Sequence, residues 1–398
     1  MATRSSVLML TATYGEGHVR AAQALAAAVE RLDPGRPVRI VDYFEYVSPA
    51  MNRLARRLYV GSVRRVPLLY GKWYNATRAI PEDSLIQRTL DHYRVDSLRR
   101  LLDDTRPAAV VSTFPIPAGV LSTLRRERGY DVPSAVAVTD YTVHSQWIHS
   151  GIDLYMVGHE ELRQGLIARG LPPEHVVVTG IPIDPRFGDP HPPRPDGPPW
   201  QVLVMGGAYG MLPGTLKMVV ALVGIPDVNV VLVAGRDRQL RQQGEDLARQ
   251  HQGRLTVTGY TTEIPSLMAA SHLLVTKAGG LTVSEALAMR LPLMIYRPLP
   301  GQEEANVEFL VRHRAARVFH DRPSLVHEVG EILQGGRLAQ GQGWAGALGR
   351  ADSAMLGARL LLGLAAEGPK RDLVAAPPLA VAVEPSTVLP LPEGGQEA

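Results

Sequence analysis

The sequence predicts an α/β protein with two domains, each built on a parallel β-sheet. Short apolar runs rich in valine, isoleucine and leucine alternate with helical patterns, and these runs lack the polar–apolar alternation of half-exposed strands. A proline-rich break interrupts this alternation near the middle of the chain, after which the alternation restarts. A length of 398 residues suits two domains of ordinary size. We therefore expect two Rossmann-like domains of similar size.

The first domain is expected to span residues 1–187 and to contain six strands. Helical patterns such as 20–32 and 97–103 lie between successive apolar runs. Continuous apolar runs indicate strands that are covered by helices on both faces, as in a parallel sheet. The expected strands lie at 7–10, 38–41, 109–112, 135–138, 154–157 and 176–179.

The segment GDPHPPRPDGPPW at 188–200 separates the domains. Six of its residues are proline, which excludes a helix or a central strand and predicts a stiff linker. The second domain is expected at 201–350, a closing amphipathic helix at 351–367 and a disordered tail at 368–398, where proline and small residues dominate. The expected strands of the second domain lie at 202–205, 228–233, 255–257, 273–276, 293–296 and 316–319.

The bulk composition excludes several classes of protein. Apolar residues make up 45% and charged residues 20%, which is ordinary for a globular chain, and the net charge of +3 is too small to favour a nucleic-acid partner. The absence of cysteine excludes disulfides and thiolate metal sites. No apolar stretch approaches the length of about 20 residues that spans a bilayer, and the first residues lack the pattern of a signal peptide. We expect a cytoplasmic protein whose membrane contact is peripheral, on the inner face of the cell membrane.

A basic segment is the best candidate for that contact. Residues 51–100 contain eleven arginine or lysine residues against four acidic residues, a local charge of +7. Basic side chains near an anionic leaflet contribute about 1 kcal/mol each, and aromatic side chains favour the interface. We expect this segment to dock on anionic lipid; an ordinary charged helix surface is the alternative. The membrane residues expected here are Arg56, Arg57, Arg64, Arg65 and Trp73.

The stretch TATYGEGHVRAA at 11–22 joins the first expected strand to a helix. It lacks the Lys-Ser/Thr ending of a P-loop and places His18 at the start of the helix. The helix dipole disfavours an imidazolium there, so His18 should be neutral near pH 7 and able to act as a general base. A capping or packing histidine is the alternative. Gly15 and Gly17 would form a tight turn that leaves room on the acceptor side.

A second glycine segment follows the strand expected at 273–276. Gly279 and Gly280 open a helix whose N-terminus suits a diphosphate, and Lys277 is a plausible donor to the same group. Glu285, further along this helix, could accept hydrogen bonds from ribose hydroxyls, or could simply be an acid near a helix start. Gly206 and Gly207 follow the first strand of this domain and are a weaker candidate for the same phosphates.

The loop PLPGQEEAN at 298–306 places polar side chains behind two prolines and a glycine. Amide and carboxylate groups on a rigid loop suit a polyhydroxylated sugar, because each can pair with a hydroxyl. Gln302, Glu303 and Asn306 are therefore expected to bind the donor. A solvated turn before an exposed helix is the alternative.

These segments resemble the donor-site signature of the two-domain GT-B glycosyltransferases. The similarity is to the family of monogalactosyldiacylglycerol synthase, the processive diacylglycerol glucosyltransferases and the peptidoglycan N-acetylglucosaminyltransferase, and it is strongest to the processive diacylglycerol glucosyltransferases. The pattern T-K-x-G-G-x-T-x-x-E-A followed by P-x-P-G-Q-E-x-x-N is nearly intact. The resemblance implies that Glu285 binds the ribose of UDP and that Gln302 and Glu303 contact the hexose.

The resemblance extends from the opening loop to about residue 320, whereas 51–100 and the residues after about 350 match poorly. TATYGEGHVRAA, STFPIP, VTDYTVHSQWIH, VTGIPI and VMGGAYG have counterparts in the same order. The opening loop has the Tyr-Gly-x-Gly-His form of the lipid enzymes and not the Gly-Gly-Thr-Gly-Gly-His form of the peptidoglycan enzyme. This favours diacylglycerol over a polyprenyl-linked acceptor.

The chemistry expected from these residues needs no metal and no cofactor. The chain contains no Asp-x-Asp pair, which metal-dependent sugar-nucleotide transferases usually use to hold Mn²⁺ or Mg²⁺. The acceptor hydroxyl needs a base, for which His18 is the first candidate and Asp140 the second; Asp140 could instead orient His18. His144 and Trp147 are expected on the acceptor side. The resemblance implies inversion at the anomeric carbon.

The sequence therefore predicts a UDP-sugar-dependent hexosyltransferase. The expected donor is UDP-glucose, with galactose left open, and the expected acceptor is diacylglycerol or a glycosyl-diacylglycerol. One alternative is transfer of N-acetylglucosamine from its UDP derivative to a polyprenyl-linked peptidoglycan intermediate. Another is a non-catalytic sensor of UDP-sugars.

Overall fold

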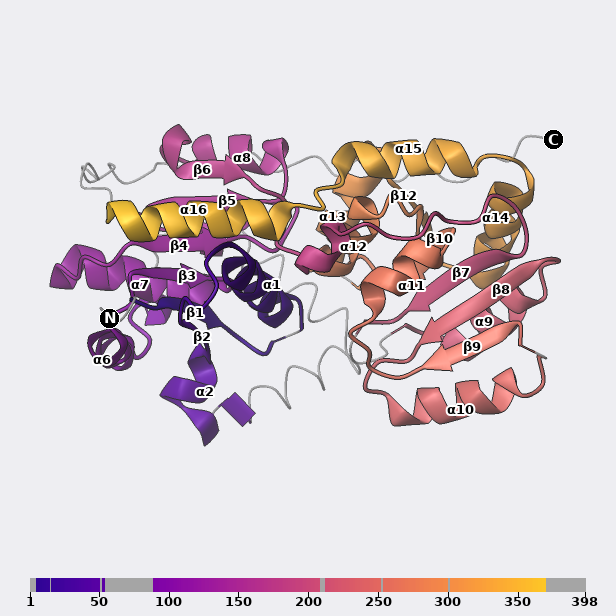
Figure 1. The fold of residues 1–398 in the computed structure, drawn as a ribbon, viewed down its shortest axis with the longest axis horizontal. Helices are drawn as coiled ribbons and strands as arrows, with labels where there is room; N and C mark the ends of the chain where they lie inside the picture. The colour runs from indigo at the N-terminus through magenta and orange to yellow at the C-terminus, as the bar shows by residue number, and fades with distance from the viewer. Residues whose placement is uncertain are drawn as a thin grey trace.

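The computed structural model describes residues 5–14, 16–50, 52–53, 89–207, 212–251, 253–299 and 301–369, with the side chain of Gln302 also outside this set. Two six-stranded sheets, all of whose strand pairs are parallel, form the centres of two α/β domains (Figure 1). The sheets follow one another along the chain. The two-domain α/β architecture expected from the sequence is thus confirmed.

The first sheet has the order β2-β1-β3-β4-β5-β6. Its helices cover both faces, which explains why its central strands are apolar throughout: β1, β3, β4 and β5 are buried at every position. The strands are β1 (Val7–Thr11), β2 (Val38–Asp42), β3 (Ala109–Ser112), β4 (Ser134–Ala137), β5 (Leu154–Val157) and β6 (Val176–Val178). The helices are α1 (Glu16–Leu32), α2 (Tyr43–Val47), α6 (Val95–Thr105), α7 (Pro115–Arg128) and α8 (Glu160–Ile167), with short 3₁₀ turns η1 (Ser145–Trp147), η2 (Pro173–His175) and η3 (Pro185–Gly188).

The second sheet has the order β12-β11-β10-β7-β8-β9. Its strands are β7 (Trp200–Met205), β8 (Val228–Val233), β9 (Leu255–Thr258), β10 (Leu273–Thr276), β11 (Leu293–Tyr296) and β12 (Ala316–Phe319). Its helices are α9 (Thr215–Val223), α10 (Arg238–Ala248), α11 (Ile264–Ala270), α12 (Gly280–Ala288), α13 (Gln302–Arg312), α14 (Arg322–Gln334) and α15 (Leu338–Leu348).

All twelve strands expected from the sequence are present, and their ends agree to within two residues. The helix expected at 20–32 begins earlier, at Glu16, so His18 lies inside its first turn. Between η3 and Trp200 the proline-rich segment forms neither helix nor strand, as its composition requires.

The closing helix α16 (Ser353–Glu367) returns to the first domain. It packs on α1 and β3, and Figure 1 shows it beside the first sheet while α15 stays with the second. The approach is close at Gly357, where a Cβ would lie 2.9 Å from Leu25 Cδ2 and 3.1 Å from Met156 Sδ, so these side chains would have to shift. The chain therefore crosses between the domains twice, which the sequence did not predict.

Two expected features lie outside the described residues. One is nearly all of the tail expected at 368–398, and the other is most of the basic segment, including Arg56, Arg57, Arg64, Arg65 and Trp73. Among the residues that are described, no helix combines the length and apolarity needed to cross a membrane.

Candidate active site between the two domains

The order of strands in each sheet indicates where a ligand is expected to bind. In the first sheet the chain reverses direction across the sheet between β1 and β3, and in the second between β7 and β10. Ligands of doubly wound sheets bind beyond the carboxyl ends of strands at such switch points. His18 follows β1 and Gly280 follows β10, so the two glycine segments found in the sequence occupy these two positions.

His18 is held by backbone and hydroxyl groups of its own domain. Its Nδ1 lies 2.9 Å from the carbonyl oxygen of Thr113 and 2.9 Å from Oγ1 of Thr139. Because a carbonyl can only accept, Nδ1 carries the proton and the lone pair of the neutral ring is on Nε2. Burial lowers the pKa of His18, against the negative charge of Asp140 and the hydrogen bond to Thr113, which raise it. His18 is therefore neutral at pH 7, as the general-base prediction requires.

Asp140 and Trp147 form a buried pair beside His18. The indole Nε1 of Trp147 donates to Oδ2 of Asp140 over 3.1 Å, and Asp140 is 5% exposed. Trp147 is itself 1% exposed and supports Asp140 from the core; its place on the acceptor side stays a prediction. His144, also expected there, is buried and accepts the backbone N–H of Gln146 at the start of η1.

The start of α12 touches the first domain at Gly280. A Cβ at Gly280 would lie 2.4 Å from the carbonyl oxygen of Thr139, so only glycine allows this contact. A Cβ at Gly17 would lie 4.0 Å from Leu281 Cβ, which places Gly17 toward the second domain. By contrast, a Cβ at Gly279 would meet nothing within 4 Å. The helix N-terminus expected to bind phosphate is thus brought beside the His18 loop.

Glu285 is the most unusual carboxylate of the site. It is 0% exposed, and its Oε1 accepts from Nη2 of Arg20 on α1 over 2.7 Å. Within the described part of the chain, its Oε2 has no hydrogen-bond partner. Burial raises the pKa of Glu285; the charge of Arg20 lowers it and that of Asp184 raises it further. A buried carboxylate oxygen without a hydrogen-bond donor is energetically unfavourable, so a ligand that supplies a donor there would be stabilised.

A second ion pair, between Lys277 and Glu303, lies within the second domain. Lys277 Nζ donates to Oε1 of Glu303 over 2.5 Å, and the backbone N–H of Leu299 donates to Oε2 over 2.8 Å. Gly207, with φ +73°, turns the chain after β7 beside this lysine, where a Cβ would lie 3.1 Å from Lys277 Cε. Gly206 precedes it and is buried.

Asn306 bridges the domains. Its Oδ1 accepts the backbone N–H of Tyr141 over 3.1 Å, and its Nδ2 donates to the carbonyl oxygen of Ala278 over 3.0 Å. Tyr141 also pairs with Ser284 Oγ over 2.8 Å. Both ends of the Asn306 amide are therefore engaged by protein, and its sugar-binding role stays a prediction, as does that of Gln302, whose side chain is not described. Gly15 likewise lies outside the described residues.

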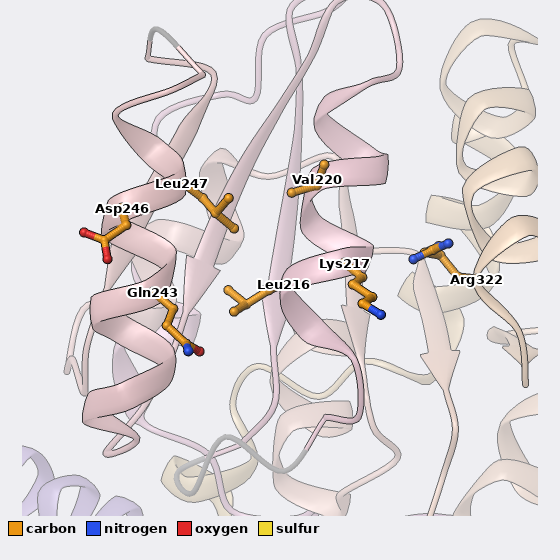
Figure 2. A pocket seen from close by; sticks show the side chains of 7 residues that line it. All are labelled: Leu216, Lys217, Val220, Gln243, Asp246, Leu247 and Arg322. Carbon is orange, nitrogen blue, oxygen red and sulfur yellow. The ribbon is translucent and has the colours of Figure 1, made fainter.

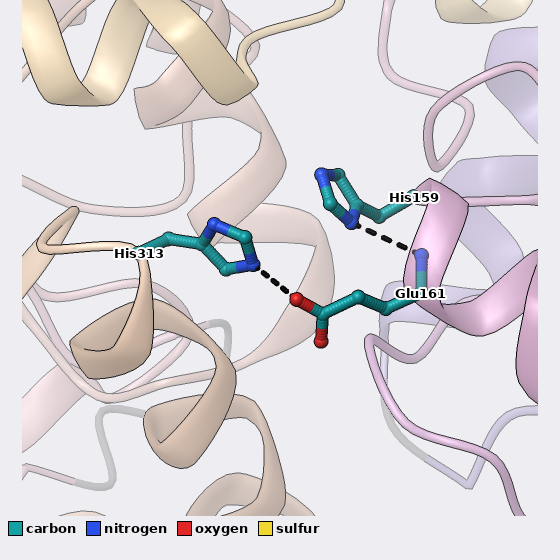
Figure 3. A group of neighbouring side chains, drawn as sticks. All are labelled: His159, Glu161 and His313. Atoms are coloured by element: carbon teal, nitrogen blue, oxygen red, sulfur yellow. Dashed lines mark hydrogen bonds and ion pairs between the residues drawn. The ribbon is translucent and has the colours of Figure 1, made fainter.

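One cluster of potential metal ligands joins α8 to the end of α13. His159, Glu161 and His313 place ligand atoms within 4.8 Å of one another (Figure 3). These atoms already have partners: His159 Nδ1 accepts the N–H of Glu161, and the two Glu161 oxygens lie 2.6 Å from His313 Nε2 and 2.7 Å from Arg312 Nη2. Glu161 thus joins the two domains through its contact with His313 and its ion pair with Arg312.

A separate hollow of about 500 Å³ lies in the second domain between α9 and α10 (Figure 2). It shares no residue with the predicted site. Its walls are Leu216, Lys217, Val220, Gln243, Asp246, Leu247 and Arg322.

Sequence reasoning missed Arg20 and Tyr141, which reach across to the second domain. Arg20 is two residues after His18, and Tyr141 follows Asp140 within the quoted motif. The motifs pointed to segments that the fold brings together, but side-chain partners 165 and 265 positions away could not be inferred from spacing alone.

Two family models match the chain, one for each domain. The model of monogalactosyldiacylglycerol (MGDG) synthase matches residues 18–183, and the glycosyltransferase family 28 C-terminal domain matches residues 202–339. A processive diacylglycerol beta-glucosyltransferase of Bacillus cereus is 31% identical over 341 residues, which cover 84% of this chain and 87% of that protein. A protein of the same name from Bacillus mycoides gives the same identity and coverage.

Solved structures agree on the fold. The chain covers 99% of Acinetobacter baumannii MurG with a TM-score of 0.58 at 17% identity, over 90% of its own length. It covers all of Phytolacca americana UGT2, solved with UDP-2fluoro-glucose and pterostilbene, with a TM-score of 0.59 at 14% identity, over 92% of its own length. The two sheets thus form a GT-B fold. The chain belongs to the glycosyltransferase family that contains the monogalactosyldiacylglycerol synthases and the processive diacylglycerol beta-glucosyltransferases.

Proposed function

We propose that this glycosyltransferase moves a hexose, with glucose as the expected sugar, from a UDP-sugar to diacylglycerol or a glycosyl-diacylglycerol. The observation that carries the proposal is His18, whose Nδ1 contact with the Thr113 carbonyl leaves the lone pair on Nε2 at the meeting point of the two domains. The names of the 31%-identical relatives support the choice of diacylglycerol and glucose.

The proposed reaction is a direct displacement. Nε2 of His18 takes the proton of the acceptor hydroxyl while the hydroxyl oxygen attacks the anomeric carbon. The bond from this carbon to the UDP oxygen breaks, and UDP leaves with the electron pair. One displacement inverts the centre, so an α-linked UDP-sugar gives a β-glycoside. The charge of Asp140 stabilises the imidazolium that forms, as it already raises the pKa of His18.

The donor is proposed to lie along α12. A ribose hydroxyl could donate to the partnerless Oε2 of Glu285, although Arg20 must first move or the domains must part, because Glu285 is fully buried. The diphosphate would face the α12 N-terminus and Lys277, which would balance the leaving-group charge without a metal. Glu303, now paired with Lys277, is the proposed hexose contact.

Peripheral binding to the inner face of the cell membrane remains part of the proposal. Liposome flotation tests it: retention on anionic vesicles that weakens with salt supports docking by the basic segment. Equal binding to neutral and anionic vesicles, unaffected by salt, would exclude electrostatic docking.

The decisive experiment is mass spectrometry of lipids made by the purified protein. UDP-glucose, UDP-galactose and UDP-N-acetylglucosamine are each offered with diacylglycerol, and UDP affinity is measured in parallel. We expect hexosyl-diacylglycerol from the wild type and a loss of about 10²–10⁴-fold in rate for His18→Gln, with UDP affinity kept. UDP binding without any transfer by the wild type would instead indicate a sensor.

A further inference from the structure

Four aromatic side chains, Tyr14, Phe44, Tyr93 and Phe114, meet in the first domain next to His18; we call them the aromatic cluster. Ring centroids are 5.2 Å apart for Tyr14 and Phe44 and 5.8 Å apart for Phe44 and Phe114, both edge to face. Tyr14 stacks on Phe114 at 6.0 Å, and Tyr93 lies 6.0 Å from Phe44. Each ring thus touches at least one other.

The cluster lies beside the predicted base, beyond the ends of three strands. Tyr14 follows β1, Phe44 follows β2 and Phe114 follows β3, so three of its rings lie beyond the carboxyl ends of adjacent strands. The Phe114 ring meets the His18 ring edge-on, with centroids 4.9 Å apart and planes at 88°. All four residues belong to the first domain, whereas the donor segments belong to the second.

All four rings are partly exposed, although Tyr93 also packs against the core of the first domain. The chain has only five phenylalanines, and two of them, Phe44 and Phe114, are in the cluster and partly exposed. Phe187 and Phe309, in contrast, are 3% and 0% exposed. Partly exposed aromatic rings gathered beside a candidate base are typical of a surface that contacts an apolar ligand.

We infer that the aromatic cluster binds the glycerol backbone and the first acyl methylenes of a diacylglycerol acceptor, and so directs its free hydroxyl to Nε2 of His18. This inference rests on the proposed function. The four rings carry two hydroxyls and no charged or amide group, which suits a hydrocarbon chain better than a sugar with many hydroxyls. Contact with ring faces would also hold the lipid at a fixed distance from the base.

The test compares Phe44→Leu, Phe114→Leu and Phe44→Ala with the wild type in mixed micelles. Phe319→Leu, at the end of β12 in the second domain, is the matched control. Loss of a ring that covers a lipid chain should raise the KM for diacylglycerol about tenfold or more for Phe44→Ala, and less for the leucine variants. The KM for UDP-glucose and the UDP affinity should stay within about twofold, and Phe319→Leu should match the wild type in all three.

The acid limb of the pH–rate profile separates lipid binding from an indirect effect on the base. It should not move in the leucine variants if the cluster binds lipid. An unchanged KM for diacylglycerol in variants that still bind UDP would overturn the inference while the proposed function stands. Absence of transfer to diacylglycerol by the wild type would overturn both.

Discussion

Replacing Arg20 with alanine tests how the two domains are held together. Arg20 Nη2 lies 2.7 Å from Oε1 of Glu285, whose side chain is 1% exposed, and the charge of Asp184 acts on the same carboxylate. Removing one partner of a buried ion pair costs about 3–5 kcal/mol. The side chain of Arg20 is 27% exposed, so water screens the pair in part and the lower end of this range applies.

Protonation of Glu285 limits how much the free energy of unfolding can fall in Arg20→Ala. From the ordinary pKa of 4.5, keeping a carboxyl protonated costs about 3.4 kcal/mol at pH 7 and about 0.7 kcal/mol at pH 5. Removing Arg20 raises the folded-state pKa of Glu285 further, so the folded variant binds a proton more readily than the unfolded chain. A drop in pH therefore favours the folded variant relative to the wild type. We expect Arg20→Ala to lower the free energy of unfolding by about 3 kcal/mol at pH 7 and by under about 1 kcal/mol at pH 5.

Urea unfolding at both pH values, followed by tryptophan fluorescence and circular dichroism, measures these losses. Arg31→Ala is the matched control, since Arg31 lies on the same helix and pairs with Asp189 at the surface, where the side chains are 40% and 45% exposed. It should lose less than about 1 kcal/mol. Small and equal losses at pH 5 and pH 7 for Arg20→Ala would refute the reasoning.

Three further predictions concern the site. Asp140→Asn removes a charge that raises the pKa of His18, so the acid limb of the kcat/KM profile should move to lower pH; complete loss of activity at every pH would instead identify Asp140 as the base. Gly280→Ala places a Cβ 2.4 Å from the Thr139 carbonyl oxygen and should lower stability by about 1–3 kcal/mol in thermal unfolding. Gly279→Ala, with open space around its Cβ, should lower stability less. Equal effects of the two variants would contradict the close contact at Gly280. Addition of EDTA should leave the initial rate of hexose transfer within about twofold, and a rate restored only by a divalent cation would show that a metal takes part.

The strands were predictable because burial on both faces imposes a continuous apolar run. The run at 154–157, for example, coincides with β5, and all of its residues are buried. Switch-point positions then follow from topology, which is why the loops of His18 and Gly280 could be placed after β1 and β10.

The partners of the site residues were not predictable in the same way. The amide of Asn306 is a group that can bind sugar hydroxyls, yet it is hydrogen-bonded to Tyr141 and Ala278. Residue type does not tell which hydrogen-bond partner lies nearest in space. Trp147 is an aromatic residue near the site, but the need to bury its ring and satisfy its N–H placed it beneath Asp140. The hydrogen-bond partners of these side chains depend on contacts between segments that are distant in the sequence.

The return of α16 to the first domain determines how the cleft can open. The two chain crossings lie side by side, since Ile183 N donates to Ser353 Oγ over 3.2 Å and a Cβ at Gly188 would lie 3.3 Å from the carbonyl oxygen of Ala351. Because the two connections lie together, a change in the angle between the domains would have to bend both segments at the same place. We expect product release to use such a bend, which would separate the α12 N-terminus from Thr139 without disrupting either sheet.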